Sequence, residues 1–467
     1  MKRNLCFFLL ISAVFLYVSC PQNEAELFQI TPAVGHEFGF FGGYVTIKNP
    51  PGNTKLYYTV SGGDPVANGI LNEEKPIRIT RDTTIKVVTK INDMVDSHVI
   101  DLPYAVFSNK LTDFALSMRI GWNLGKTMSE LEDTSNAEIQ TMLSGVKNYG
   151  FNLARIPLTW NDVDGEAEGL NKAFNIAQSV VSRTSTRIFI MITFTLDQAS
   201  FNGYDDNQII SRFNSAWTKI AAKFNTINLT DEQNGFIVFE AFSELDRNDP
   251  VIPEQQGIMN QLNQNFVNTV RQSAGKNKTR FLVLPVTNFS LISGFVLPND
   301  NLQAVAPSDD QNKLLVSVRF FEPQGFTTLG TQNKWGSKAV SAADNESYIK
   351  DQFDLLRNKF TEQNIPVILS EYGAVHQIGF EDYRRYYMEY VTKYAVDSGL
   401  IPVYWDNGDF HDNTAEEGDN SAYKFGLLNR ATGAPDNSVP AHKHNEVFTA
   451  IMQAVDGDYH INDISPP

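Results

Sequence analysis

Short apolar runs alternate with helical patterns along the chain between residues 109 and 457. Eight of these runs have the length and composition of buried strands, namely Ser117–Ile120, Leu153–Pro157, Ile188–Phe194, Gly235–Glu240, Arg280–Val286, Leu314–Arg319, Val367–Glu371 and Pro402–Trp405. Between them, apolar residues recur at helical spacing in Phe213–Phe224, Ile258–Val270 and Ile349–Phe360, and a final helix is expected from His444 to Val455. Eight strand–helix units predict an α/β protein with a (β/α)8 TIM barrel. A doubly wound open sheet is the alternative, but no glycine-rich phosphate loop follows the first expected strand.

Residues 21–108 show a different pattern, because β-branched and aromatic residues cluster there without a helical period. The expected strands are Tyr44–Lys48, Lys55–Val60 and Thr83–Thr89, with turns rich in glycine and proline between them. This pattern predicts a small β-sandwich. The segment Leu56–Pro65, followed by Thr83–Val88, resembles the immunoglobulin-like module at the C-terminus of chitobiases and β-hexosaminidases. That resemblance implies a spacer or accessory role for residues 21–108. At the other end of the chain, residues 458–467 are expected to form a C-terminal tail.

The first twenty residues have the features of a targeting segment. Lys2 and Arg3 form a basic start, and Leu5–Val18 is nearly all apolar but short for a membrane span. The small residue before Cys20 resembles the bacterial lipoprotein signal, in which this cysteine is lipidated and becomes the new N-terminus. We therefore expect residues 1–20 to be a signal peptide and the protein to be exported and lipid-anchored at the bacterial cell envelope, on the periplasmic face or the outer surface. A plain signal peptide with an incidental cysteine is the alternative.

Composition and charge restrict the classes of partner. The 467 residues are 42% apolar and 20% charged, as in an ordinary globular protein, and carry a net charge of −16. This charge argues against nucleic acid and against electrostatic binding to anionic membranes, and it fits a neutral substrate. We expect a monomer without cofactor or metal. His376 and His411 are expected in surface loops, with a position in the lining of a cleft as the alternative. His442 and His444 are expected in exposed positions, because no acid-rich cluster with metal-ligand spacing accompanies them.

Two glutamates stand where apolar strands are expected to end, Glu244 after the run from Phe236 and Glu371 after the run from Pro366. A pair of carboxylates is what glycoside hydrolysis needs, and the active site of a TIM barrel lies at the C-terminal ends of its strands. The other polar or aromatic residues at the expected strand ends are Asn123, Arg155, Thr195, Asp197, Ser243, Asn288, Arg319 and Trp405. Together they predict one site at the barrel mouth.

Several motifs in this region resemble glycoside hydrolase family 5, in particular its bacterial endoglucanase and xyloglucanase branch. The matching stretches are Arg119–Gly125, Gly150–Pro157, Phe239–Glu244, Leu315–Phe321, Ile368–Ala374, Val403–Gly408 and Gly426–Arg430. The resemblance implies that Glu244 is the general acid/base and Glu371 the nucleophile of a retaining mechanism, with carboxyl groups about 5–5.5 Å apart. It further implies that Arg155 orients the nucleophile and that Trp405 stacks on the sugar beside the cleaved bond.

The sequence departs from the family's pattern around these glutamates. Ser243 replaces an asparagine that binds the sugar 2-hydroxyl, and Arg319 and Phe321 replace a histidine and a tyrosine. A histidine is also missing after the third strand, where Asp197 is a candidate replacement. Losing one preorganised donor costs roughly 10²–10³ in rate, so several losses together weaken catalysis further. An ion pair between Arg319 and Glu371 is expected to hold the carboxylate charged but to reduce its nucleophilicity.

The leading hypothesis is therefore a lipid-anchored hydrolase of β-linked glycans, similar to endo-β-1,4-glucanases. The alternative is a catalytically impaired pseudo-glycosidase that binds glycans or surfaces, because Ser243, Arg319 and Phe321 depart from the family's pattern. An adhesion or structural lipoprotein that uses mainly the N-terminal sandwich is a third possibility.

Overall fold

The computed structural model describes most of the chain, in the ranges 30–31, 37–38, 43–60, 63–79, 83–92, 94–95, 98–106, 110–196, 203–243, 252–286, 309, 311–337, 345–409, 424–438, 440–457 and 459–467. Five residues singled out by the sequence lie outside these ranges: Cys20, Asp197, Glu244, Asn288 and His411. The chain divides into two compact units, residues 1–109 with 458–463 and residues 110–457 with 464–467. Each unit is described by itself.

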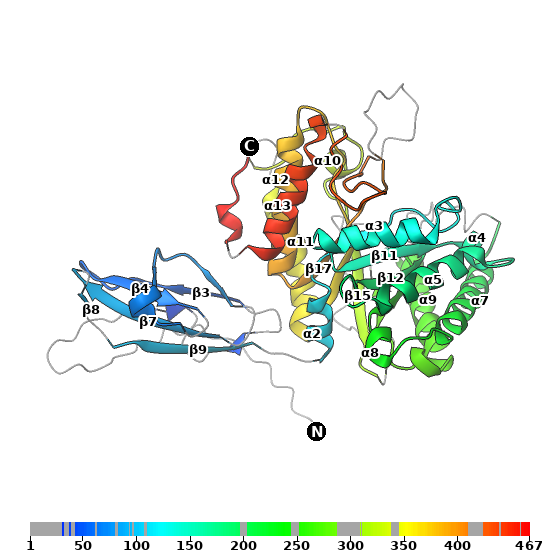
Figure 1. Cartoon of the computed structure of the whole chain (residues 1–467), viewed down its shortest axis with the longest axis horizontal. Coiled ribbons are helices and arrows are strands. Elements are labelled where there is room, and N and C mark those ends of the chain that lie inside the picture. Colours follow the sequence, from blue (N-terminus) through cyan, green and yellow to red (C-terminus); the bar gives the residue numbers. More distant parts are fainter. Residues whose placement is uncertain are drawn as a thin grey trace. The chain divides into compact units, whose positions relative to one another are not determined.

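The first unit contains two sheets (Figure 1). The smaller sheet has the order β1–β3–β6, with β1 at Ile30–Thr31, β3 at Gly43–Ile47 and β6 at Ile77–Ile79. The larger sheet has the order β2–β9–β7–β4–β5, with β2 at Glu37–Phe38, β9 at Ile100–Val106, β7 at Thr83–Ile91, β4 at Lys55–Thr59 and β5 at Ile70–Leu71, and β8 at Met94–Val95 pairs with β7.

Alternate residues of both sheets form one apolar core. Val45 and Ile47 of β3 and Ile85 and Val87 of β7 are fully buried, as expected for strands that present every second side chain to the interior. Most of the strand pairs are antiparallel. The predicted immunoglobulin-like β-sandwich is thereby confirmed.

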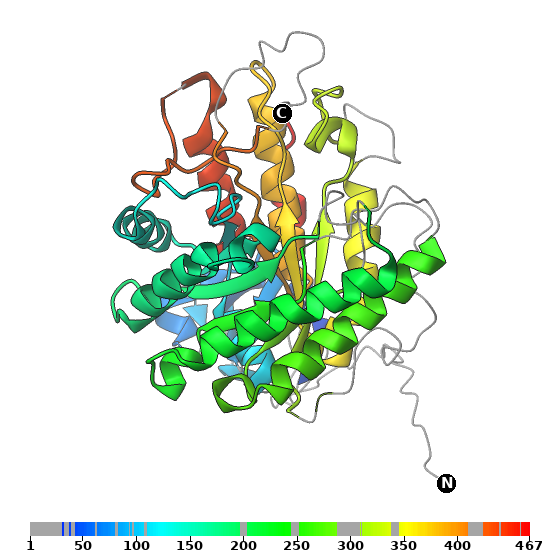
Figure 2. The same cartoon turned by 90° about the vertical axis from the view of Figure 1, so that its right-hand side faces the viewer.

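The second unit is built on a closed barrel of eight parallel strands that pair in chain order (Figure 2). The strands are β10 (Gly121–Asn123), β11 (Leu153–Leu158), β12 (Phe189–Phe194), β13 (Ile237–Glu240), β14 (Leu282–Pro285), β15 (Leu314–Phe320), β16 (Val367–Tyr372) and β17 (Leu400–Tyr404). The predicted TIM barrel is confirmed, and seven of the eight expected strands match with small shifts at their ends.

The first expected strand, Ser117–Ile120, is wrong. Ser117 ends a helix, α2 (Lys110–Ser117), and Arg119 adopts a left-handed conformation with φ of 57° before β10 begins at Gly121. The apolar residues Leu111, Ala115 and Met118 have the i, i+4, i+7 spacing of a helix, and this short segment carries that period.

Helix α2 closes the N-terminal end of the barrel. Leu111 and Ala115 of α2, with Met118 directly after it, share a buried cluster with side chains from the beginnings of the strands, among them Leu153, Phe189, Val238, Val283, Leu315, Ile368 and Ile401. The ring of Phe114 stacks on that of Phe281 at 3.4 Å and meets Phe189 edge to face at 5.4 Å. Because apolar side chains fill this end of the barrel, the polar residues of an active site are expected at the opposite, C-terminal ends of the strands.

Helices surround the barrel (Figure 2). The longer ones are α3 (Asn136–Asn148), α5 (Glu168–Ser182), α7 (Asp206–Asn225), α9 (Ile252–Gln272), α11 (Glu346–Lys359), α12 (Glu381–Asp397) and α13 (His444–Asp456). One-turn helices lie at α1 (Pro65–Asn68, in the first unit), α4 (Trp160–Val163), α8 (Asp231–Asn234) and α10 (Gln324–Thr327). The helices predicted from apolar spacing, α7, α9, α11 and α13, are confirmed. Across the described ranges, no helix is both long enough and apolar enough to cross a bilayer.

Candidate active site

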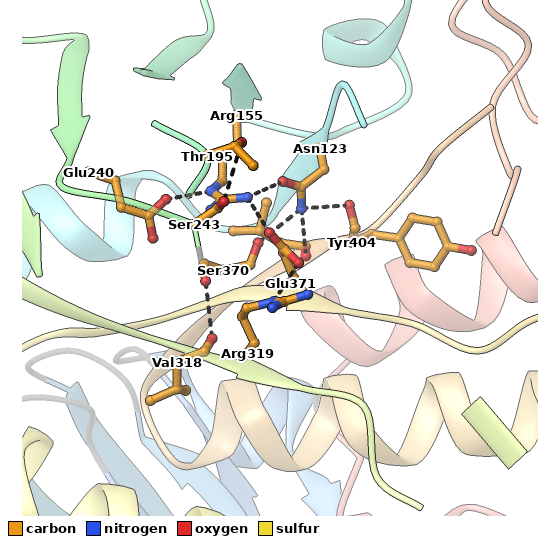
Figure 3. A network of polar contacts seen from close by, with 11 residues as sticks. Asn123, Arg155, Thr195, Glu240, Ser243, Val318, Arg319, Ser370, Glu371 and Tyr404 are labelled. Carbon is orange, nitrogen blue, oxygen red and sulfur yellow. Dashed lines mark hydrogen bonds and ion pairs between the residues drawn. The ribbon is translucent and has the colours of Figure 1, made fainter. Parts of the chain in front are cut away.

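A buried arginine on β11 connects three neighbouring positions at the C-terminal ends of the strands (Figure 3). Arg155 donates from Nε to Oε2 of Glu240 at 2.5 Å, and from Nη1 to Oε1 of Glu371 at 2.7 Å and to Oδ1 of Asn123 at 2.9 Å. Its side chain is 1% exposed. Burial by itself would lower the pKa of Arg155, but attraction and hydrogen bonds from Glu240 and Glu371 outweigh burial and raise that pKa. The arginine is therefore a permanent cation that orients Glu371.

Glu371 is held from its other side by a second arginine. Arg319 on β15 donates from Nε to Oε2 of Glu371 at 2.7 Å, so each carboxylate oxygen of Glu371 accepts from a different guanidinium group (Figure 3). The ion pair expected from the sequence is thus present. Its origin is a register shift between Val318 and Arg319, which places Arg319 opposite Glu371. Without the shift, Arg319 would pair with Ser370 instead.

Asn123, the last residue of β10, holds neighbouring strands together at the point where the first and last strands of the barrel meet. Its Nδ2 donates to the carbonyl oxygens of Ser370 at 2.9 Å, Tyr404 at 3.2 Å and Val403 at 3.3 Å, while its Oδ1 accepts from Arg155. Because an amide has distinct donor and acceptor ends, these four contacts define one orientation of the side chain. Asn123 thereby joins β10, β16 and β17 to the arginine that contacts Glu371.

Glu240 is a site residue that the sequence reasoning did not single out. It ends β13 and is fully buried, and its Oε2 accepts from Arg155. An acid inside an otherwise apolar strand was the available signal, since a buried carboxylate needs a charged or hydrogen-bonding partner. Strand β13 thus ends on this buried acid. Glu244, the predicted general acid/base, comes four residues later in the sequence.

The remaining predicted residues lie at the same ends of the strands. Ser243 is buried and its Oγ lies 3.4 Å from Oγ1 of Thr195. Trp405 follows β17, is half-buried, and its backbone N–H donates to the carbonyl oxygen of Tyr372 at 2.9 Å. Phe321 is half-buried, 5.8 Å from the guanidinium of Arg319 and edge to face with Phe425 at 5.6 Å. The carboxyl separation between Glu244 and Glu371 and the replacement of histidine by Asp197 stay predictions, because Glu244 and Asp197 lie outside the described residues.

A further buried carboxylate, Asp406, organises the segment after Trp405. Its Oδ2 accepts from Nε1 of Trp122 at 2.9 Å and from the backbone N–H of Leu428 at 2.9 Å, and its Oδ1 accepts from the N–H of Gly408 at 2.9 Å. Gly125, with φ of 66°, is required beside it, because a Cβ at that position would lie 2.0 Å from the carbonyl oxygen of Asp406. These contacts hold the backbone that carries Trp405.

The expectation that His376, His442 and His444 are exposed is wrong. They are 2%, 0% and 1% exposed, and the ring centroids of His376 and His442 are 3.9 Å apart. His376 follows β16 and His444 begins α13, and the three rings contact one another across this distance in sequence, which apolar spacing along the chain does not reveal. Burial, and secondly the positive charge of Arg384, lower the pKa of His376 to about 2 and that of His444 to about 3. Within the described part of the chain, no group of three or more His, Cys, Asp or Glu residues is arranged to hold a metal ion.

An eight-stranded parallel barrel with an arginine–glutamate network at the C-terminal strand ends defines a TIM-barrel enzyme. The family model described as "Cellulase (glycosyl hydrolase family 5)" matches residues 120–411, more than half of the chain. The chain belongs to glycosyl hydrolase family 5, whose members are glycoside hydrolases acting on O-glycosyl bonds. A second model, "Fn3 associated", matches residues 45–104, which fits an immunoglobulin-like module without specifying the chitobiase type.

Individual relatives agree with this assignment. The chain is 28% identical to Endoglucanase A of Paenibacillus barcinonensis over 380 residues, which cover 72% of this chain and 88% of the relative. It is 26% identical over 373 residues to a xyloglucan-specific endo-beta-1,4-glucanase of Bacteroides ovatus, covering 70% of this chain and 68% of that protein. The solved structure of a family 5 xyloglucanase from Paenibacillus pabuli superposes with a TM-score of 0.57 at 26% identity, covering 73% of this chain and 99% of that one. The chain is thus an endoglucanase- or xyloglucanase-like member of the family.

Proposed function

We propose that this protein hydrolyses β-linked glycans, in the manner of an endo-β-1,4-glucanase, by a retaining mechanism with two glutamates. The observation that carries the proposal is the position of Glu371, which lies next to the last residue of β16 and is oriented by the buried cation of Arg155. A carboxylate held in this way is suited to attack in a fixed direction. Relatives named as endoglucanases and as a xyloglucan-specific endo-beta-1,4-glucanase support the substrate class.

The reaction has two steps. A carboxylate oxygen of Glu371 bonds to the anomeric carbon while the glycosidic C–O bond breaks, and Glu244 gives its proton to the leaving oxygen. Glu244 then takes a proton from water, whose oxygen bonds to the anomeric carbon and releases Glu371. Arg155 keeps Glu371 oriented, and Trp405 supplies an aromatic surface for the sugar ring. These steps need no cofactor.

The proposal includes export and anchoring by a lipid on Cys20, with the enzyme acting as a monomer at the cell envelope on polysaccharide or oligosaccharide. The support is the apolar run Leu5–Val18 ahead of Cys20. Incorporation of an alkyne fatty acid by the full-length chain in a bacterial host, compared with Cys20→Ala, tests the anchor. Equal labelling of the two would contradict it.

Hydrolysis is tested with the purified protein on β-glucan, xyloglucan, mannan and aryl β-glycosides, beside Glu244→Gln and Glu371→Gln. We expect cleavage by the wild type only, and proton NMR of the first product should show retained anomeric configuration. Trapping with a 2-deoxy-2-fluoro glycoside should place the label on the peptide that contains Glu371. Wild type and both variants indistinguishable on every substrate would refute hydrolysis by these residues.

A second candidate function, glycan binding by a catalytically impaired barrel, is favoured by one observation. Both oxygens of Glu371 accept from guanidinium groups, and a carboxylate satisfied on both sides is a weaker nucleophile. The double variant Ser243→Asn with Arg319→His separates the two functions. Cleavage gained by the double variant from an inactive wild type that binds glycan would identify an impaired glycosidase. Cleavage by the wild type itself excludes it.

A further inference from the structure

We infer that Arg430 is a positioning residue for Trp405: it holds the residue directly after Trp405 and thereby sets the orientation of the indole toward the sugar. This inference rests on the proposed function, in which Trp405 supplies an aromatic surface for the sugar ring. In the described part of the chain Arg430 makes no hydrogen bond or ion pair with Glu371, because its hydrogen bonds all go to Asp406. Its influence on the reaction therefore passes through Trp405.

The first argument is the contact between Arg430 and the segment that carries Trp405. Nη2 of Arg430 donates to the backbone carbonyl oxygen of Asp406 at 2.6 Å and to its carboxylate Oδ1 at 3.1 Å, so one nitrogen holds both the main chain and the side chain of that residue. On the other side, the backbone N–H of Trp405 donates to the carbonyl oxygen of Tyr372 at 2.9 Å. Pairing with β16 thus restrains the backbone on the N-terminal side of Trp405, and Arg430 restrains it on the C-terminal side.

The second argument is the enclosure of the Arg430 guanidinium. Its central carbon lies 4.7 Å from the ring centroid of Trp122, whose Nε1 donates to Oδ2 of Asp406 at 2.9 Å. A Cβ on Gly408, which has φ of 71°, would lie 2.5 Å from Nε of Arg430, so glycine leaves the room that the guanidinium needs. Nε and Nη1 of Arg430 are buried without a hydrogen-bond partner among the described residues. Because a buried donor without a partner costs free energy, stability alone does not favour an arginine at this position.

The third argument is the close attachment of the turn that carries Arg430. The backbone N–H of Gly433 donates to the carbonyl oxygen of Asn429 at 2.8 Å and closes the turn. The turn packs on α3 so closely that a Cβ on Gly145 would lie 1.8 Å from the carbonyl oxygen of Thr432. Glycine inside a helix costs roughly 1 kcal/mol relative to alanine, and this close approach explains its presence in α3. Arg430 therefore extends from a fixed base.

These contacts matter for the reaction because stacking on a sugar depends on the plane of the indole. A displacement of about 1 Å in a group that positions the substrate can cost roughly 10²-fold in rate. Without Arg430, Asp406 keeps its hydrogen bonds with Trp122 and with the backbone N–H groups of Gly408 and Leu428. The segment should therefore stay folded while the indole of Trp405 gains freedom, so the loss should fall mainly on substrate binding and turnover.

The first test needs no substrate. The chain has five tryptophans, so labelling with 5-fluorotryptophan gives one fluorine NMR resonance for each, and the resonance that is lost in Trp405→Phe belongs to Trp405. We expect Arg430→Gln to shift or broaden this resonance and that of Trp122, which Arg430 contacts directly. The resonances of Trp217 and Trp335 should stay in place. An unchanged Trp405 resonance in Arg430→Gln overturns the inference, whether or not the protein is active.

Arg187→Gln is the matched control. The Arg187 guanidinium also lies over an aromatic ring, that of Phe236 at 5.0 Å, but Arg187 precedes β12 at the opposite end of the barrel, so its loss should leave the Trp405 resonance unchanged. Arg430→Lys keeps the charge beside Asp406 and serves if Arg430→Gln does not fold, and it should move the same resonance by less. A Trp405 resonance that stays in place in every folded Arg430 variant contradicts the positioning role.

The second test is a double-mutant cycle of Arg430→Gln and Trp405→Ala. It measures kcat/KM on an aryl β-cellobioside and Kd for cellotetraose by calorimetry. We expect Arg430→Gln to lower kcat/KM by about tenfold when Trp405 is present and by less than about twofold in the Trp405→Ala background, because the effects of coupled residues do not add. A merely structural role would reduce both backgrounds alike, and equal losses therefore overturn the inference.

The outcomes also separate this inference from the proposed function. Cleavage by the wild type, with equal losses in the two backgrounds, overturns the positioning role and leaves the hydrolase standing. A shifted Trp405 resonance in a protein that binds glycan without cleaving it supports the positioning role and overturns hydrolysis. If no probe is bound or cleaved, the proposed function fails, and the Trp405 resonance decides whether Arg430 orients the indole.

Discussion

The guanidinium of Arg155 and the carboxylate of Glu240 form an enclosed ion pair, with Nε and Oε2 2.5 Å apart and both side chains shielded from solvent. Removing the charge of Glu240 deprives Arg155 of one of its two carboxylate partners in a low-dielectric interior, and Glu371 is left to balance it. Glu240→Gln should therefore cost about 3–5 kcal/mol of unfolding free energy, measured by chemical denaturation. It should also lower kcat, because Arg155 then draws Glu371 toward itself.

The matched control for that variant is Glu232→Gln, in an ion pair with Arg187 that has a similar distance of 2.9 Å but an acid 80% exposed. Exposed pairs contribute about 0–1 kcal/mol, so this change should be nearly silent. Equal destabilisation by the two substitutions would show that enclosure of the Arg155–Glu240 pair has no energetic importance.

The hydrogen bonds of Asn123, where the first and last strands of the barrel meet, can be tested by substitution. Asn123→Ala removes one acceptor for Arg155 and one donor shared among three carbonyl oxygens. We expect a loss of about 1–3 kcal/mol in stability together with a lower kcat. Exposed Asn148 supplies the control, since Asn148→Ala should change neither. A fall in stability with unchanged kcat would disconnect Asn123 from the orientation of Glu371.

Phe114 at the closed end of the barrel should affect stability without affecting chemistry. Phe114→Ala removes the contacts with Phe281 and Phe189, and because the ring is only partly buried the cost should be roughly 2–3 kcal/mol, at or below the range for core phenylalanines. Thermal unfolding gives the loss, and kcat at a temperature well below the Tm should match wild type. A change in kcat under those conditions would contradict the separation of the two ends.

The buried histidines predict acid sensitivity of the fold. The folded pKa values of His376 and His444, about 2 and 3, lie below the unfolded value of 6.5, so below pH 6.5 the unfolded chain binds protons that the folded chain does not. Stability should then fall with decreasing pH, by up to about 1.4 kcal/mol per pH unit for each histidine. The Glu381 carboxyl, whose pKa burial raises to about 6, acts in the opposite direction between pH 4.5 and 6.

Two histidines outweigh one glutamate, so net loss of stability toward acid is expected between pH 6.5 and 4. Unfolding free energy measured across this range should show a steeper slope for wild type than for His376→Phe. Slopes that coincide would mean that His376 takes up its proton as readily in the folded state as in the unfolded one.

The sequence predicted the barrel because seven strands and four helices carry clear apolar periods that tertiary packing does not override. It missed α2, because a helix of eight residues between a sandwich and a barrel shows little more than two turns of its period. It also missed the burial of the histidines, since the segments that enclose them are distant in the chain. Such contacts leave no local pattern.

The candidate site was predicted in part for the same reason. Glu371, Arg155 and Asn123 lie in otherwise apolar strands, and parallel strands in a closed barrel bring such residues together. Glu240 was treated as part of its strand, because one acid at the end of an apolar run does not reveal a partner on another strand. The contact between Arg319 and Glu371 depends on a register shift in the pairing of β15 with β16, which residue spacing does not encode.

That shift also makes residue 319 a useful position for engineering. The register shift between Val318 and Arg319 places position 319 opposite Glu371, and regular strand pairing is present on either side of the shift. A small library at this one codon would therefore sample acidic, neutral and basic surroundings of the nucleophile on an unchanged scaffold.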